Sequence, residues 1–157
     1  MLIKGFKDED FVNYKKSSMF VGFPYCTFKC DKECGKQVCQ NSALANSQGI
    51  EISIPNLVNR YINNPITEAI VCGGLEPFDT YQQLLEFITE LRKQTDDDIV
   101  IYTGYYKNEI QDYINELMQF KNIIIKFGRY IPNQKKHFDN VLEINLASDN
   151  QYAEKIS

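Results

Sequence analysis

The sequence has no excess of basic residues. Its 157 residues include 17 Lys and Arg against 21 Asp and Glu, so the formal net charge at pH 7 is -4. Proteins that bind nucleic acids generally carry a basic surface that neutralises phosphates. A direct nucleic-acid partner is therefore not expected.

Long apolar runs are also missing at the start of the chain. Residues 1–10 mix short apolar stretches with Lys4, Lys7 and three consecutive acidic residues. This pattern is typical neither of a signal peptide nor of a membrane span, so we expect no membrane partner and a cytoplasmic location. Internal repeats, low-complexity tracts and long linkers are absent as well. The predicted organisation is a single domain over residues 1–157.

Cysteine, in contrast, is concentrated in one place. Cys26, Cys30, Cys34 and Cys39 fall within one short polar segment, and Cys72 stands apart in an apolar stretch, where we expect it to belong to the core. In a reducing compartment such a cluster indicates a metal or redox site rather than disulfides. Thiolates suit both iron-sulfur clusters and zinc. The spacer between the two cysteine pairs is short for a structural zinc site, so an iron-sulfur cluster is favoured. A non-catalytic zinc-binding module is the alternative.

Apolar runs of strand length alternate with segments whose apolar residues recur at helical spacing. The expected strands are 19–23, 69–72, 99–102, 123–126 and 141–146, and the expected helices are 54–62, 84–91 and 110–117. This alternation implies right-handed crossovers and a mostly parallel sheet covered by helices. Four or five strands are too few to close an eight-stranded β/α barrel, which takes about 250 residues. The predicted fold class is α/β, a partial (open) β/α barrel with the cysteine loop after the first core strand, and Asp79 is expected to cap the helix over 84–91.

Each expected parallel strand is followed by residues suited to a binding site. The cysteines follow the first strand, Gly73-Gly74-Leu75-Glu76 the second, Thr103-Gly104 the third and Gly128-Arg129-Tyr130 the fourth. Because parallel strands end at the same edge of a sheet, these segments are expected to share one rim and one pocket. Taken alone, the two glycines are also typical of a plain strand-to-helix turn, and Glu76 of a cap.

Several motifs resemble the radical S-adenosylmethionine activating enzymes, in particular those of anaerobic ribonucleotide reductases. The matching segments are Cys26–Cys30, Cys39–Ser42, Gly73–Pro77, Ile101–Tyr105, Gly128–Tyr130 and Ala147–Gln151. The resemblance covers most of the chain. It implies a 4Fe-4S cluster held by three cysteines, with S-adenosylmethionine bound at the iron that has no protein ligand.

The resemblance implies Cys26 and Cys30 as two of the cluster ligands and leaves two candidates for the third. The family spaces its three cysteines by three and then two residues, whereas this chain has one cysteine more and wider spacing. Cys39 is favoured because Gln40 and an asparagine follow it, as in the family, and because a loop insertion costs little. Cys34 is the alternative third ligand.

The resemblance also implies residues around S-adenosylmethionine. Tyr25 and Phe28 are expected to pack against the cluster or the adenine, and the open backbone of Gly73 and Gly74 to meet the methionine amino group. The polar candidates for ligand contacts are Glu76, Thr103 and Arg129. No catalytic residue is expected beyond the cluster.

The activity implied by the resemblance is reductive cleavage of S-adenosylmethionine to a 5'-deoxyadenosyl radical. The expected partners are a large glycyl-radical enzyme, the anaerobic ribonucleoside-triphosphate reductase, and a flavodoxin-like or ferredoxin-like electron donor. Another glycyl-radical enzyme or a peptide is an alternative target.

Overall fold

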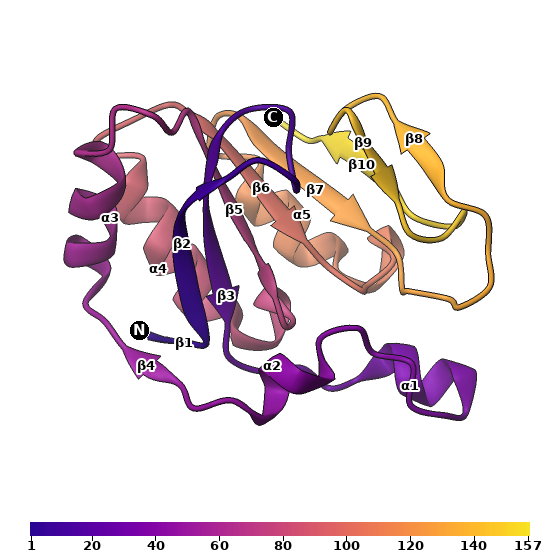
Figure 1. Ribbon diagram of the computed structural model, residues 1–157. Helices are drawn as coiled ribbons and strands as arrows, with labels where there is room; N and C mark the ends of the chain where they lie inside the picture. The colour runs from indigo at the N-terminus through magenta and orange to yellow at the C-terminus, as the bar shows by residue number, and fades with distance from the viewer.

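The computed structural model describes residues 1–157 and is built around an open, six-stranded sheet (Figure 1). In spatial order the strands are β10 (Tyr152–Lys155), β7 (Ile123–Phe127), β6 (Asp98–Tyr102), β5 (Ala69–Gly74), β3 (Ser18–Phe23) and β2 (Gly5–Asp10). The four inner strands run parallel, and the two edge strands run antiparallel to their neighbours. The sheet is therefore mostly parallel, as the sequence predicted, and it does not close into a barrel.

The other elements connect these strands or lie outside the sheet. They are β1 (Leu2–Ile3), α1 (Lys29–Cys34), α2 (Ser42–Asn46), β4 (Ile50–Glu51), α3 (Ile54–Ile62), η1 (Pro77–Thr80), α4 (Tyr81–Leu91), η2 (Lys107–Glu109), α5 (Gln111–Leu117), β8 (His137–Asp139) and β9 (Ile144–Leu146). Two antiparallel pairs, β1 with β4 and β8 with β9, stand apart from the main sheet. None of the helices combines the length and apolar composition needed to cross a bilayer.

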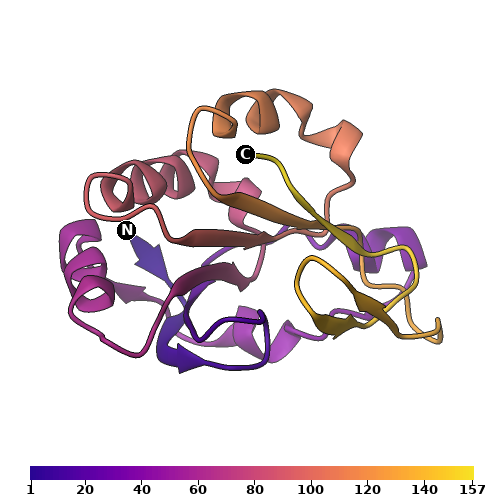
Figure 2. The same ribbon diagram turned by 90° about the horizontal axis from the view of Figure 1, so that it is seen from above.

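The two faces of the sheet belong to separate apolar clusters. Figure 2 shows α3, α4 and α5 along one face, where alternate strand residues such as Val21, Cys72 and Ile101 are fully buried. On the other face Val71 and Val100 pack against residues that precede β3 and follow β7. Burial on both faces explains why the parallel strands read as continuous apolar runs. The prediction that Cys72 belongs to the core is confirmed.

The sequence prediction fails at the edges of the sheet. Strand β2 is rich in charged residues, which suit an edge strand and conceal it from a search for apolar runs. The strand expected at 141–146 is wrong as placed, because only 144–146 is extended and it pairs with β8 outside the sheet. The edge next to β7 is instead occupied by β10.

Candidate metal centre

The cysteine segment, residues 25–56, lies below the carboxyl ends of the parallel strands (Figure 1). None of its residues is buried, and all of its cysteines are free thiols of intermediate exposure. Helix α1 carries Cys30 and Cys34, whereas Cys26 precedes it and Cys39 follows it. The segment is thus a polar loop that leaves its sulfurs accessible.

The pKa values of two thiols reflect their neighbours. Burial raises the pKa of Cys26 to about 12. The hydrogen bond from the Phe28 amide opposes this rise, and the charges of Glu76, Asp79 and, least of all, Cys39 add to it. Burial likewise raises the pKa of Cys30, where the Tyr130 amide, Lys126 and Arg129 oppose it and Cys39 again adds to it. Cys39 therefore lies near both Cys26 and Cys30.

Backbone contacts hold Cys26 and Cys39 in place. Phe28 adopts a left-handed conformation with φ 53°, and its amide donates a hydrogen bond to the Cys26 sulfur at 3.2 Å. The Asp31 carboxylate accepts hydrogen bonds from the amides of Val38 and Cys39, at 2.7 and 2.8 Å. The sequence did not single out Asp31, although an acidic residue between closely spaced cysteines is a usable signal for a side chain that binds loop amides.

The loops after four parallel strands converge on Cys30, as expected from the topology. A Cβ placed on Gly104, after β6, would lie 3.6 Å from the Cys30 sulfur and 3.6 Å from a Glu76 oxygen, after β5. The backbone amide of Tyr130, after β7, lowers the pKa of the same thiol. The absence of a side chain at Gly104 lets the cysteine approach this edge of the sheet.

Glu76 and Thr103 bind each other at this edge. The Glu76 side chain is buried and accepts hydrogen bonds from the Thr103 hydroxyl and the Gly104 amide, both at 2.8 Å, and from the Phe78 amide at 3.2 Å. The Glu76 carboxylate thus joins the loops after β5 and β6. It also caps η1, which is the alternative role that the sequence suggested for it.

Burial raises the pKa of Glu76 to about 7, against the hydrogen bonds that favour its ionised form. The unfolded chain loses this proton near its ordinary value of 4.5, so the stabilising contribution is fully present below that pH and is lost as pH rises through 7. We expect the free energy of unfolding of the metal-free protein to fall by about 3 kcal/mol from this group between pH 5 and pH 8. Urea unfolding across that range measures it.

Glu76→Gln is expected to remove this slope, because the amide does not titrate. The exposed carboxylate of Glu86 on α4 provides the control, and Glu86→Gln should keep the wild-type slope. An unchanged pH dependence in Glu76→Gln would contradict the assignment of the slope to this buried carboxyl.

Two more polar side chains at this edge have surroundings that the sequence did not predict. Asp79 does not cap α4 as predicted, because a 3-10 turn intervenes and Thr80 takes that position. Its carboxylate instead accepts from the Thr27 amide and the Tyr105 hydroxyl, both at 2.6 Å, and so ties the cysteine segment to the loop after β6. Lys126 is buried in β7, and burial lowers its pKa to about 8. A lysine inside the run Ile123–Phe127 was the available signal.

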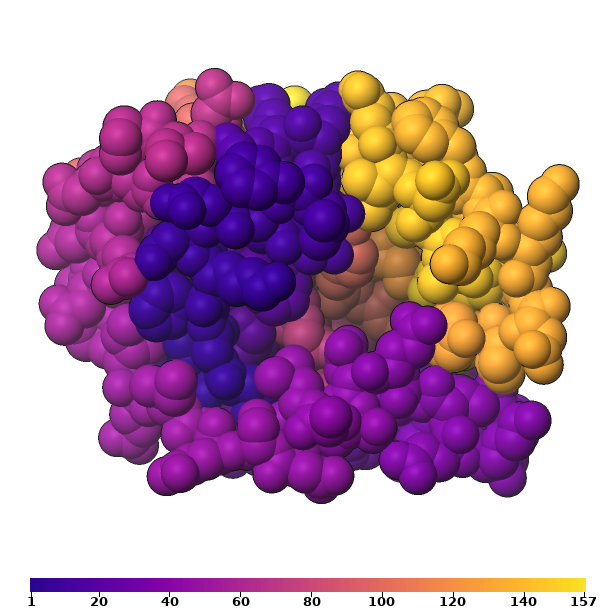
Figure 3. Space-filling view, in the orientation of Figure 1, coloured from indigo at the N-terminus to yellow at the C-terminus, as the bar shows by residue number.

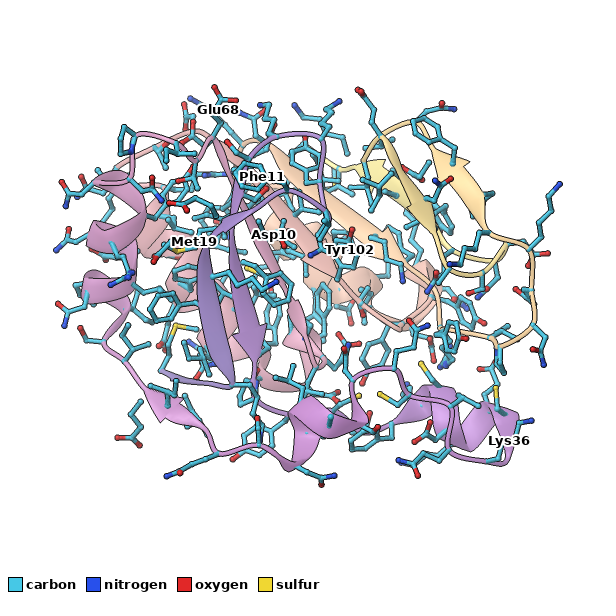
Figure 4. All side chains as sticks on the ribbon, viewed as in Figure 1. Asp10, Phe11, Met19, Lys36, Glu68 and Tyr102 are labelled. Carbon is cyan, nitrogen blue, oxygen red and sulfur yellow. The ribbon has the colours of Figure 1, made fainter.

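The sheet face away from the helices is open near the cysteine segment. Figure 3 shows a hollow there, bounded by N-terminal residues in indigo, the cysteine segment in purple and C-terminal residues in yellow. Tyr102, labelled in Figure 4, comes from the middle of the sheet in this region. A Cβ on Gly73 would meet the Phe20 ring at 3.3 Å and Tyr102 at 3.4 Å. The missing side chain at Gly73 therefore lets the Phe20 ring and Tyr102 pack closely against the backbone of β5.

Three other predicted site residues have specific surroundings. The Gly74 carbonyl accepts a hydrogen bond from the Asn41 side chain, which links β5 to the residues that follow Cys39. Tyr25 is 57% exposed, so its ring faces solvent at the rim. The Arg129 side chain is buried against Glu33 and Glu109. Its hydrogen bond is the first of the causes that lower the pKa of Glu109 to about 2.

Comparison with known proteins identifies the kind of centre. Residues 15–152 match the family model of the 4Fe-4S single cluster domain. The chain belongs to that family. The match takes in all five cysteines and all four strand-end loops. No protein of curated function and no solved structure matches the sequence.

The residues present fit a 4Fe-4S cluster. Such clusters are held by cysteine thiolates, and this 4Fe-4S domain offers free, accessible thiols on a loop without buried side chains that can wrap around a centre. No three His, Cys, Asp or Glu side chains lie close enough to enclose a single metal ion. Ligation requires the thiols to lose their protons. Burial opposes this for Cys26 and Cys30, and the Phe28 and Tyr130 amides offset part of that effect.

Proposed function

We propose that this 4Fe-4S domain is a radical S-adenosylmethionine enzyme that activates a glycyl-radical enzyme. The observation that carries the proposal is the convergence of Cys30 with Glu76, Gly104 and the Tyr130 amide at the carboxyl edge of a parallel sheet. This is the edge where ligands bind in parallel α/β folds. In this proposal the open sheet corresponds to the partial β/α barrel expected from the sequence.

Three thiolates are the proposed cluster ligands, from Cys26, Cys30 and Cys39. The influence of Cys39 on the pKa of the other two thiols supports its choice over Cys34. The link from Asn41 to the Gly74 carbonyl supports it further, because it fixes the residues after Cys39 against β5. With one iron free of protein ligands and an electron from a flavodoxin-like or ferredoxin-like donor, the bound cluster supplies reductive cleavage of S-adenosylmethionine to methionine and a 5'-deoxyadenosyl radical.

The protein's own groups bind and orient the substrate in this proposal. Gly73 and Gly74, at the carboxyl end of β5, are proposed to present their backbone to the methionine amino group. Glu76 and Thr103 hold the loops after β5 and β6 in register through their shared hydrogen bond. Phe28 turns the cysteine segment toward the sheet, and no side chain needs to act as a general base.

The proposed partner is the anaerobic ribonucleoside-triphosphate reductase, whose glycine would enter from solvent. The hollow opens on the molecular surface, and the exposed ring of Tyr25 lies on the cysteine segment beside it. A short chain with an open site relies on its partner to complete the enclosure and to exclude water. Another glycyl-radical enzyme or a peptide would use the same site.

The test is anaerobic reconstitution with iron and sulfide, reduction, and addition of S-adenosylmethionine. We expect a brown protein with four irons per chain at full occupancy that releases 5'-deoxyadenosine and methionine in equal amounts. Electron paramagnetic resonance of the candidate reductase then reports the glycyl radical. A reconstituted cluster that leaves S-adenosylmethionine intact contradicts the proposal, and a colourless protein with stoichiometric zinc supports the zinc module instead.

A further inference from the structure

The cysteine segment is attached to the sheet without an apolar anchor. None of residues 25–56 is buried, and α1 has six residues, far fewer than a helix needs for stability alone in water. Most helices in proteins are held by an apolar face against a core. The contacts that fix α1 are therefore polar, and their chemistry decides how firmly the cysteines are presented.

Arg129 makes the most buried of these contacts. Its side chain is 8% exposed, and its Nη2 donates to Glu109 Oε1 at 2.6 Å while its Nε lies 3.0 Å from Glu33 Oε2. The guanidinium also stacks on the Tyr106 ring, 4.5 Å from the ring centre. Glu33 belongs to α1 and Glu109 to η2. One side chain after β7 thus joins the cysteine helix to the loop after β6.

The neighbouring side chains strengthen the same junction. The Tyr106 hydroxyl donates to Glu33 Oε1 at 3.2 Å. Lys29, next to Cys30 on α1, donates to Glu109 Oε1 at 3.2 Å and lies 4.0 Å from the centre of the Tyr105 ring. Both ends of this short helix are therefore tied to η2 by charged groups.

We infer that Arg129 is a positioning residue that docks the cysteine helix through Glu33 and Glu109 and thereby slows loss of the cluster. The guanidinium reaches two carboxylates at once, which an ammonium group cannot do with the same geometry. The clamp acts on the cluster loop and does not depend on which reaction follows. It gives Arg129 a role different from the ligand contact that the sequence resemblance implied.

Two nitrogens of the guanidinium are buried and have no hydrogen-bond partner. Nε makes only the ion-pair contact with Glu33, and Nη1 makes neither an ion pair nor a hydrogen bond. A ligand contact through Nη1 is the competing role for Arg129. The two roles differ in what they change: docking governs the rate of cluster loss, whereas a ligand contact governs the affinity for S-adenosylmethionine at an unchanged rate of loss.

The experiment measures cluster loss from the anaerobically reconstituted protein after addition of an iron chelator. Arg129→Lys is expected to speed loss about tenfold, the range seen when supporting partners of metal ligands are removed. Glu33→Gln, which changes a more exposed partner, should speed it about threefold. The double variant should lose its cluster no faster than Arg129→Lys alone, because both substitutions break the same contact, between Arg129 and Glu33. Glu33→Asp, which keeps the carboxylate, should lose its cluster more slowly than Glu33→Gln.

A second measurement follows the metal-free protein by hydrogen exchange. Amides of residues 29–39 should exchange faster in Arg129→Lys and Glu33→Gln, while the melting temperature stays near that of the wild type. Glu143→Gln is the matched control, because it breaks an exposed ion pair with Lys15 outside this network. Rates in both variants equal to those of the control overturn the inference. So does a wild-type rate of cluster loss combined with weakened binding of S-adenosylmethionine.

Discussion

Cys39→Ala is expected to abolish stable cluster binding, whereas Cys34→Ala leaves it nearly intact. Cys39 lies close enough to add to the effect of burial on the pKa of both Cys26 and Cys30, and its backbone amide donates a hydrogen bond to the Asp31 carboxylate. Removing a ligand costs more than removing an outer partner, so retention of iron should fall by more than about 100-fold. Cys34 is the last residue of α1, and its backbone amide has no hydrogen bond to a side chain like the one that fixes Cys39.

The measurement is iron and acid-labile sulfide per chain after anaerobic reconstitution, together with the paramagnetic resonance of the reduced cluster. Cys34→Ala is the matched control, because it removes a thiol from the same segment. The reverse pattern, with iron retained in Cys39→Ala and lost in Cys34→Ala, would make Cys34 the third ligand. Iron lost equally in both variants would indicate a centre saturated by four thiolates, which leaves no iron free for a substrate.

The inner part of the fold was accessible from the sequence because its strands are buried on both faces. Runs such as Ile99–Ile101 and Ile123–Ile125 are apolar without interruption, and the helices between them keep an apolar face at regular spacing. The edge strands are different. Charged β2 has no apolar pattern, and β10 is placed by its pairing with β7, a contact distant in sequence that no local pattern encodes.

The chemistry of the candidate site could be predicted from the sequence, but the pairing of its side chains could not. Cysteine spacing indicated a metal, and the parallel topology put Gly73, Thr103 and Arg129 on one rim. The sequence did not reveal that Glu76 and Thr103 bind each other or that Arg129 is held by two carboxylates. Partners of this kind come from four different segments, and their pairing follows from how closely those segments approach once the sheet has formed.

Gly74→Ala is expected to lower the free energy of unfolding by about 2 to 4 kcal/mol. Gly74 has φ +81°, a left-handed conformation that costs an alanine about 1 to 2 kcal/mol. A Cβ there would also lie 3.0 Å from Gly22 Cα, on the neighbouring strand, and 3.0 Å from a methyl carbon of Leu44 in α2. Leu44 can rotate away, but the backbone of Gly22 cannot move without shifting β3.

The same substitution should disturb the metal centre. Displacing β5 from β3 strains the hydrogen bond from Asn41 to the Gly74 carbonyl, which anchors the residues after Cys39. We therefore expect Gly74→Ala to take up less iron on reconstitution as well as to unfold at lower urea concentration. The two readouts should change together, since both depend on the approach of β5 to β3.

Gly35→Ala separates the conformational cost from the steric one. Gly35 also has positive φ, at +66°, but a Cβ there meets nothing within 4 Å. This variant should lose only about 1 kcal/mol. An equal loss in the two variants would mean that the strands adjust freely around Gly74. A larger loss in Gly74→Ala, with reduced iron uptake, would show that close contact between two glycine-bearing strand ends shapes this rim.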